Sequence, residues 1–205
     1  MGLTKAQEEE LSRLDEAVGA QLAAKPKRLA HSRRVAEEAA RIAVSHGVDE
    51  FEARAAGLLH DWSKALSKDE TIARARELGI DLGVDLALVS PLLHGIVAAR
   101  ELPGLFPELP ASVFQAIERH TLGSADMSPL DMAVFVADGI EPGRPSTETI
   151  ERLRAEDETA PLDELYFHAF AMGAAYVLET ERYLYPGTLD IYNRLVLGRA
   201  KGKEI

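Results

Sequence analysis

Histidine and aspartate residues interrupt apolar stretches of this 205-residue chain. His31 extends the apolar stripe of a helix by one turn, and the dipeptide His60-Asp61 ends the run AAGLL. Asp138 lies within the run MAVFVADGI. An unpaired polar group in apolar surroundings costs roughly 1–3 kcal/mol, and an ionised carboxylate costs far more. A divalent cation would remove that cost, because it keeps carboxylates charged and imidazoles neutral. The pattern therefore indicates a buried metal site.

Two further histidines add nitrogen donors to this set. His120 continues the apolar stripe of its own helix, so it is expected to face inward. His94 lies in the first turns of a helix opened by Ser90 and Pro91, where anions are favoured. The combination of imidazoles with a helix start is typical of a site that binds phosphate or metal.

Each of these residues also has an ordinary structural explanation. A lone histidine on an apolar stripe is more often a hydrogen-bonded core residue than a ligand, and Asp138 alone could be a capping or ion-paired group. Lys64 and Arg144 are solvated surface charges unless a site is established. His46 directly precedes Gly47 and is expected to end its helix rather than bind a ligand.

The elements that must position these residues are helical in pattern. The apolar spacing predicts helices over 4–24, from Pro26 through His46, from Asp49 with its apolar face extending to Trp62, and over 69–78, 90–100, 111–120, 128–138 and 162–183. Stretches 102–110 and 141–145, rich in Pro and Gly, are expected to be loops. No sustained two-residue alternation, long-period repeat or Ser/Gly-rich linker occurs, so one all-α domain is predicted.

Composition narrows the function classes. The formal charge of −11 repels polyanions, which disfavours binding to nucleic acid. The absence of cysteine removes disulfides and thiolate chemistry, so any metal must be held by His, Asp or Glu. No signal peptide and no apolar run of about 18 residues is present, so a cytoplasmic protein without a membrane partner is expected.

The order His31, His60-Asp61, Asp138 resembles the H…HD…D signature of the HD-domain metal-dependent phosphohydrolases. The stretches LLHDWSK (58–64), LLHG (92–95), AIERHTLG (116–123) and ADGIEPGR (137–144) resemble the bacterial YqeK family within that superfamily. The resemblance covers 26–193, which leaves 1–25 as an N-terminal packing helix and 194–205 as a tail.

This resemblance implies a helical bundle with a metal site at its centre. The family cleaves diadenosine tetraphosphate symmetrically to two ADP and uses iron, with manganese or another divalent metal as an alternative. The resemblance makes His31, His60, Asp61 and Asp138 the metal ligands. His94 and His120, on the same resemblance, contact the phosphates or hold a second metal.

Hydrolysis is expected to proceed by attack of a metal-bound hydroxide on a central phosphorus atom. Asp61 would ligate the metal and accept a proton, while Lys64, His94 and His120 stabilise charge on the phosphoryl oxygens. The residues expected to bind substrate are Arg28, Lys64, His94, His120, Thr121, Arg144, Tyr185 and Thr188. Arg144 suits bidentate phosphate binding, and Tyr185 is a candidate for stacking on a base, with core packing as its alternative.

Other functions remain open from the sequence. One is a different HD enzyme, such as a nucleotidase or a guanosine tetraphosphate hydrolase. Another is a nucleotide-sensing module that does not hydrolyse its ligand. Gly139, Leu122 and Tyr192 depart from the family pattern and leave base preference and phosphate chain length undetermined. The oligomeric state is equally open, and a homodimer is compatible with the sequence.

Overall fold

The structure, a computed structural model, describes residues 2–157 and 159–202. Over these residues the chain forms α-helices and two short 3₁₀ helices without a β-strand, which confirms the predicted all-α class. The helices are α1 (Lys5–Gln21), α2 (Pro26–Ser45), α3 (Glu50–Leu59), η1 (Trp62–Ala65), α4 (Lys68–Glu77), η2 (Ser90–Leu92), α5 (Leu93–Leu105), α6 (Ala111–Arg119), α7 (Pro129–Ile140), α8 (Glu148–Glu156), α9 (Leu162–Glu179) and α10 (Pro186–Gly202).

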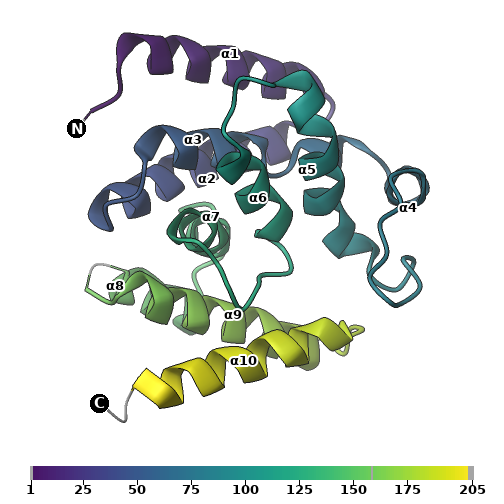
Figure 1. Cartoon of the computed structure of the whole chain (residues 1–205), viewed down its shortest axis with the longest axis vertical. Helices are drawn as coiled ribbons and strands as arrows, with labels where there is room; N and C mark the ends of the chain where they lie inside the picture. Colours follow the sequence, from purple (N-terminus) through teal and green to yellow (C-terminus); the bar gives the residue numbers. More distant parts are fainter. Residues whose placement is uncertain (1, 158, 203–205) are drawn as a thin grey trace.

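The helices are stacked around a central group. Figure 1 shows α1 along one side of the molecule, α2, α3, α6 and α7 in the middle, and α8, α9 and α10 along the opposite side. The main apolar core runs through this stack and takes buried residues from every α-helix from α1 to α9 except α4. A smaller cluster joins α4 to α5 through Ile72, Leu86 and Leu93.

Helix α2 follows from signals that are legible in the sequence. Pro26 occupies its first turn, where the missing N–H group costs nothing. His31, Val35, Ala39 and Ile42 are all buried, as the stripe predicts. The helix ends at its C-cap residue, His46, as expected, because the following glycine adopts a positive φ of 70°.

Helix α3 packs closely on α2 because its contact face carries small residues. Asp49 caps α3 by accepting a hydrogen bond from the N–H of Glu52. At Gly57 the two backbones approach so closely that a Cβ atom would lie 2.6 Å from the Cα of Ala36. This close approach brings the start of α2 beside the end of α3.

Several boundaries differ from the sequence expectation. Helix α3 ends at Leu59, so Trp62 lies in η1 and packs edge-on against Phe106 instead of continuing the α3 face. Helix α5 runs to Leu105 through Pro103, into the expected loop at 102–110. A proline near the end of a helix disturbs few hydrogen bonds, which explains why the helix persists there.

The C-terminal part holds two helices that the apolar pattern did not reveal. Helix α8 is capped by Thr147, and α10 begins at Pro186. Helix α9 ends at Glu179, four residues before the predicted end. The expected tail at 194–205 begins inside α10, and its last residues, 203–205, lie outside the described part of the chain.

Among the described residues, no helix is both long enough and apolar enough to cross a membrane. This observation agrees with the lack of long apolar runs in the sequence.

Replacing Gly57 with alanine should separate α2 from α3. The added methyl group meets the Ala36 backbone, which no rotamer change can relieve, so a loss of about 1–3 kcal/mol in the free energy of unfolding is expected. Urea denaturation measures it. Gly173→Ala is the control, because a Cβ there meets nothing within 4 Å and is expected to stabilise α9 by about 0.5–1 kcal/mol. Equal stability of Gly57→Ala and the wild type would contradict this packing.

Candidate metal centre

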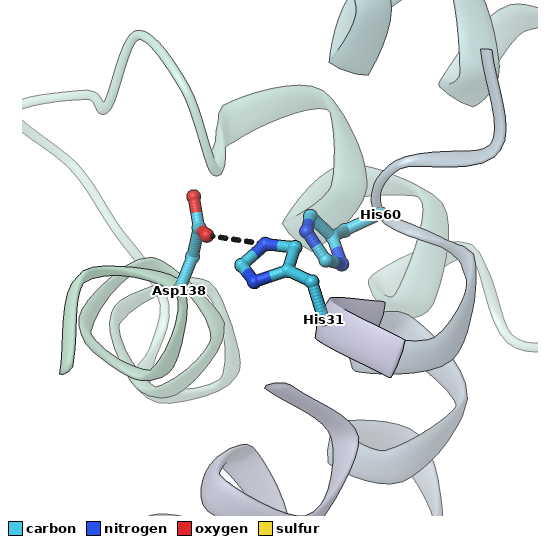
Figure 2. A group of neighbouring side chains, drawn as sticks. All are labelled: His31, His60 and Asp138. Carbon is cyan, nitrogen blue, oxygen red and sulfur yellow. Dashed lines mark ion pairs between the residues drawn. The ribbon is translucent and has the colours of Figure 1, made fainter. Parts of the chain in front are cut away.

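The polar residues singled out in the sequence meet in the middle of the bundle. His31 comes from α2 and Asp138 from α7, while His60 and Asp61 follow the last residue of α3. Figure 2 shows His31, His60 and Asp138 turned toward one another from these separate elements. The structure therefore brings together residues up to 107 positions apart in the chain, from 31 to 138.

The ligand atoms of these residues lie within reach of a single ion. Nε2 of His31 is 3.0 Å from Oδ1 of Asp138 and 3.7 Å from Oδ2 of Asp61. Nε2 of His60 is 3.4 Å from the same Asp61 oxygen. His31, His60 and Asp138 each offer one atom within 4.8 Å of the others, and so do His60, Asp61 and His120. Two overlapping groups of donors thus share His60.

Three of the histidines are oriented by the same local contact. Nδ1 of His60, His94 and His120 lies 2.7, 2.9 and 2.6 Å from the backbone carbonyl oxygen of the residue three positions earlier. A carbonyl oxygen only accepts, so Nδ1 carries the proton and donates it. The Nε2 lone pair of each ring is then directed toward the centre of the cluster, which is the tautomer that a metal ligand requires.

His31 is oriented by a carboxylate instead of a carbonyl. Its Nδ1 lies 3.0 Å from Oε1 of Glu141, which is 1% exposed. Glu141 also accepts hydrogen bonds from the Arg34 guanidinium and from the N–H of Gly143. Burial opposes ionisation of Glu141, but these donors outweigh it and lower the pKa of Glu141 to about 2. A charged Glu141 therefore keeps the His31 Nε2 lone pair free.

His94 and His120 form a second pair beside the first cluster. Their Nε2 atoms are 2.9 Å apart, and Nε2 of His94 is 3.1 Å from Oδ1 of Asp61. Burial lowers the pKa of both imidazoles, that of His120 to about 3, with nearby histidines adding to the effect. If both rings are neutral and carry their proton on Nδ1, their two Nε2 lone pairs point at each other and repel. A cation or a hydrogen-bond donor between them would relieve this repulsion. The Thr121 hydroxyl, 3.0 Å from Nε2 of His120, is one such donor.

The donor set fits a divalent metal. Nε2 of His31 and of His60 is fully buried and has no hydrogen-bond partner among the described residues, so each lone pair is available to an ion. Burial opposes ionisation of Asp61 and Asp138, yet positive charge and hydrogen-bond donors on the histidines, with Arg144 beside Asp138, hold the pKa of each carboxyl below its usual value. Burial likewise opposes protonation of His60, but Asp61 in return raises the pKa of His60, so a cation bound here would take the place of the His60 proton. Neutral imidazoles with ionised carboxylates are the ligands that iron, manganese and zinc accept.

Basic side chains surround the carboxylates. Arg28 donates to Oδ2 of Asp61 at 2.8 Å, and Arg144 pairs with Asp138. Both arginines line a cavity of about 610 Å³ together with Lys25, Lys27 and Arg34, and His31 forms part of its wall. We call it the Arg28 cavity. Glu141 is the one acidic residue in this lining, so the cavity is cationic although the chain is acidic.

Two of the predicted substrate residues are placed elsewhere. Tyr185 packs against the smaller apolar cluster, the alternative that the sequence had left open. The N–H of Thr188 donates to the Tyr185 carbonyl at the start of α10. Over residues 2–157 and 159–202, no hydrogen bond or ion pair joins either side chain to the histidines. Their predicted roles in binding substrate remain predictions.

No role was predicted for Glu141 or Arg34 from the sequence. Glu141 directly follows the apolar run of α7, three residues beyond Asp138. Arg34 lies one helical turn after His31. These spacings place each beside a candidate ligand, but only the packing of α2 against the end of α7 shows that they meet.

Comparison with known proteins agrees with the signature. Residues 28–143, more than half of the sequence, match the family described as HD domain. The chain belongs to this family. It is 33% identical to the "Bis(5'-nucleosyl)-tetraphosphatase, symmetrical" of Staphylococcus aureus, over 82% of this chain and 86% of that protein. The protein of the same name from Halalkalibacterium halodurans is 32% identical over 83% and 89%.

A solved structure shows the same fold. The HD-family chain resembles a crystal structure described as an HD superfamily hydrolase involved in NAD metabolism, from Clostridium acetobutylicum, with a TM-score of 0.81 and 29% identity. The match covers 90% of this chain and 96% of the other. It extends beyond the HD match and so includes most of the flanking helices.

Manganese should stabilise the protein through this cluster. At a hundredfold excess over its Kd, a bound ion adds about 2.7 kcal/mol, which raises Tm by about 5–10 °C. His60→Phe keeps a ring of similar size but removes the buried Nε2, so the rise should be lost. His168→Phe, a half-buried histidine paired with Glu156, is the control and should keep it. An undiminished rise in His60→Phe would contradict this metal site.

Glu141→Gln should alter how stability depends on pH. Because its folded pKa is about 2 and its ordinary value is 4.5, the charge of Glu141 stabilises the fold above pH 4.5, and this contribution disappears as the pH falls toward 2. The variant should be less stable than the wild type by about 1.5–3 kcal/mol at pH 7. The difference should shrink below pH 4.5. Urea denaturation in the presence of a chelator tests this, and a difference independent of pH would refute it.

Proposed function

We propose that this protein is a metal-dependent hydrolase that cleaves diadenosine tetraphosphate symmetrically and releases two ADP. The observation that carries the proposal is a buried His/Asp cluster at the end of a cationic cavity. A cluster of this type suits hydrolysis of phosphoanhydrides, and the cations suit an oligophosphate. The proposed substrate and the symmetrical position of cleavage are inferred from the names of the relatives.

The metal would be held by His31, His60, Asp61 and Asp138. When bound, a divalent ion lowers the pKa of a water ligand and neutralises phosphoryl oxygens. We propose iron as the natural metal, from the family resemblance. Manganese or another divalent ion is compatible with the same nitrogen and oxygen donors. His94 and His120 complete a second group of donors or contact the phosphates directly.

The cations of the chain hold the substrate. Arg28 and Arg144 each contact a carboxylate of the cluster, and both side chains also reach the cavity, being 38% and 36% exposed. A guanidinium has five donors, so it can keep the carboxylate and bind a phosphate oxygen at the same time. Lys64 belongs to η1, and although burial lowers its pKa, the Asp61 carboxylate nearby opposes this and favours its positive charge.

The protonation states assign different tasks to Asp61 and His94. Burial opposes ionisation of Asp61, but the histidines beside it hold its pKa low, so Asp61 is ionised and available both to ligate the metal and to accept a hydrogen bond from water. His94 stays neutral because burial lowers its pKa, and its Nε2 lies 3.1 Å from Asp61. A lowered pKa makes His94 a weak base as well, so we assign it to orienting Asp61 and the phosphoryl oxygens, while Asp61 remains the proposed acceptor of the proton that water loses.

An intracellular nucleotide substrate of this kind fits a cytoplasmic enzyme. The −11 charge of the chain repels long polyanions, while the Arg28 cavity attracts a small one. No feature of the described site favours a nucleotidase, a guanosine tetraphosphate hydrolase or a sensor that does not hydrolyse its ligand.

Product analysis tests the proposal. The manganese-loaded protein should convert diadenosine tetraphosphate to ADP as the sole nucleotide product, and a chelator should stop the reaction. Asp61→Asn should lower kcat more than about a hundredfold while the far-UV circular dichroism stays unchanged. Asp163→Asn, an exposed aspartate at the start of α9, is the matched control and should retain activity. Formation of AMP and ATP would refute symmetrical cleavage.

A further inference from the structure

A second, smaller cavity reaches the same cluster from another side. It measures about 230 Å³ and lies between η1, the start of α4 and η2. We call it the α4 cavity. Its lining consists of Ser63, Lys64, Leu66, Ser67, Lys68, Thr71, Ser90, Pro91 and His94. The Arg28 cavity meets the cluster at His31, whereas the α4 cavity meets it at His94.

The lining of the α4 cavity carries positive charge. It includes two lysines and no aspartate or glutamate. Neither Lys64 nor Lys68 takes part in an ion pair in the part of the chain that the structure describes. The cavity also lies at the N-terminus of α4, where the helix dipole favours negative charge. These features suit a phosphate group.

One buried hydroxyl in this cavity lacks a partner. Ser63 is 1% exposed, and its Oγ makes no hydrogen bond with any described residue. Two neighbouring hydroxyl oxygens already take part in hydrogen bonds, because Ser67 Oγ accepts from the N–H of Glu70 and Thr71 Oγ1 donates to the Ser67 carbonyl. A buried hydroxyl left unsatisfied is costly, so a ligand that accepts a hydrogen bond from it would be favoured there.

We propose that the α4 cavity binds the phosphates of one half of a dinucleoside polyphosphate while the Arg28 cavity holds the other half. This inference rests on the proposed function. Symmetrical cleavage divides the substrate into two equal nucleoside diphosphates, so each side of the metal cluster must accommodate one. The two cavities supply these two binding sites. They reach the cluster at His31 and at His94, and both histidines lie within 3.7 Å of Asp61.

The sizes of the cavities assign different parts of the substrate to each. About 610 Å³ lies within the range of small-molecule sites, so the Arg28 cavity takes a complete nucleoside diphosphate. About 230 Å³ is below that range, so the α4 cavity takes the diphosphate and leaves the base outside. The two halves are thus bound by different means although they are chemically identical.

Ser63 also lines a larger cavity of about 950 Å³ on the other side of η1. That cavity carries glutamates as well as arginines and includes none of the histidines of the cluster. A phosphate is therefore better accommodated in the α4 cavity, where the charge is of one sign and His94 is present.

Calorimetric titration with ADP measures how many ADP molecules each chain binds, and so tests for two binding sites. The manganese-loaded wild type should bind two ADP per chain, and Lys68→Glu should bind one. Lys68→Glu should also raise KM for diadenosine tetraphosphate about tenfold with kcat little changed. Lys5→Glu reverses an exposed lysine on α1 and is the matched control, which should keep two ADP and an unchanged KM.

Ser63→Ala separates ligand binding from a structural role. If the hydroxyl binds phosphate, the variant should lose affinity for the second ADP severalfold without a lower unfolding midpoint. A single ADP in the wild type, or a second ADP unaffected by both variants, would overturn the inference. Absence of hydrolysis by the wild type would instead refute the proposed function, because the ADP count does not depend on turnover.

Discussion

The bond from each Nδ1–H to a fixed acceptor is the interaction on which the site depends. An imidazole has two nitrogens, and only the one without a proton can bind a metal. Three carbonyl oxygens and the Glu141 carboxylate hold the protons on Nδ1, so four Nε2 lone pairs converge. The carbonyl acceptors lie three residues earlier, at the end of α3, at the end of α6 and at the junction of η2 with α5. Backbone geometry at helix ends thus determines the ligand tautomers.

Convergence also requires that α2 and α3 nearly touch. His31 and His60 come from these two helices, and their rings lie 5.2 Å apart between centroids. A side chain larger than hydrogen at Gly57 would meet the backbone of Ala36, so the spacing of the helices is set by the absence of a Cβ. The sequence AAGLLHD therefore contributes to the candidate metal site in two ways, through the candidate ligands His60 and Asp61 and through the glycine three residues before His60.

Periodicity predicted the residues whose position depends on one helix. His31 and His120 follow apolar stripes, and both are buried. Contacts between distant segments left no such pattern, which is why Glu141 with Arg34 and the α4 cavity could not be foreseen. Helix α10 escaped prediction for a related reason, since much of it, including Leu189 and Leu197, is exposed and gives no clear apolar face. The resemblance to a family supplied the candidate ligands, and the structure shows that these residues lie together.

The pairing of arginines with the cluster gives this acidic chain a local concentration of positive charge, which the proposed oligophosphate substrate requires. Asp61 and Asp138 are each neutralised in part by a guanidinium, Arg28 and Arg144 respectively. A divalent metal would neutralise the same carboxylates and so weaken the hold on both arginines, which makes their positive charge available to the Arg28 cavity. Metal binding and phosphate binding are then coupled, because each makes the other more favourable. The positive potential is thus concentrated in the cavity beside the cluster, while the chain as a whole carries a net charge of −11.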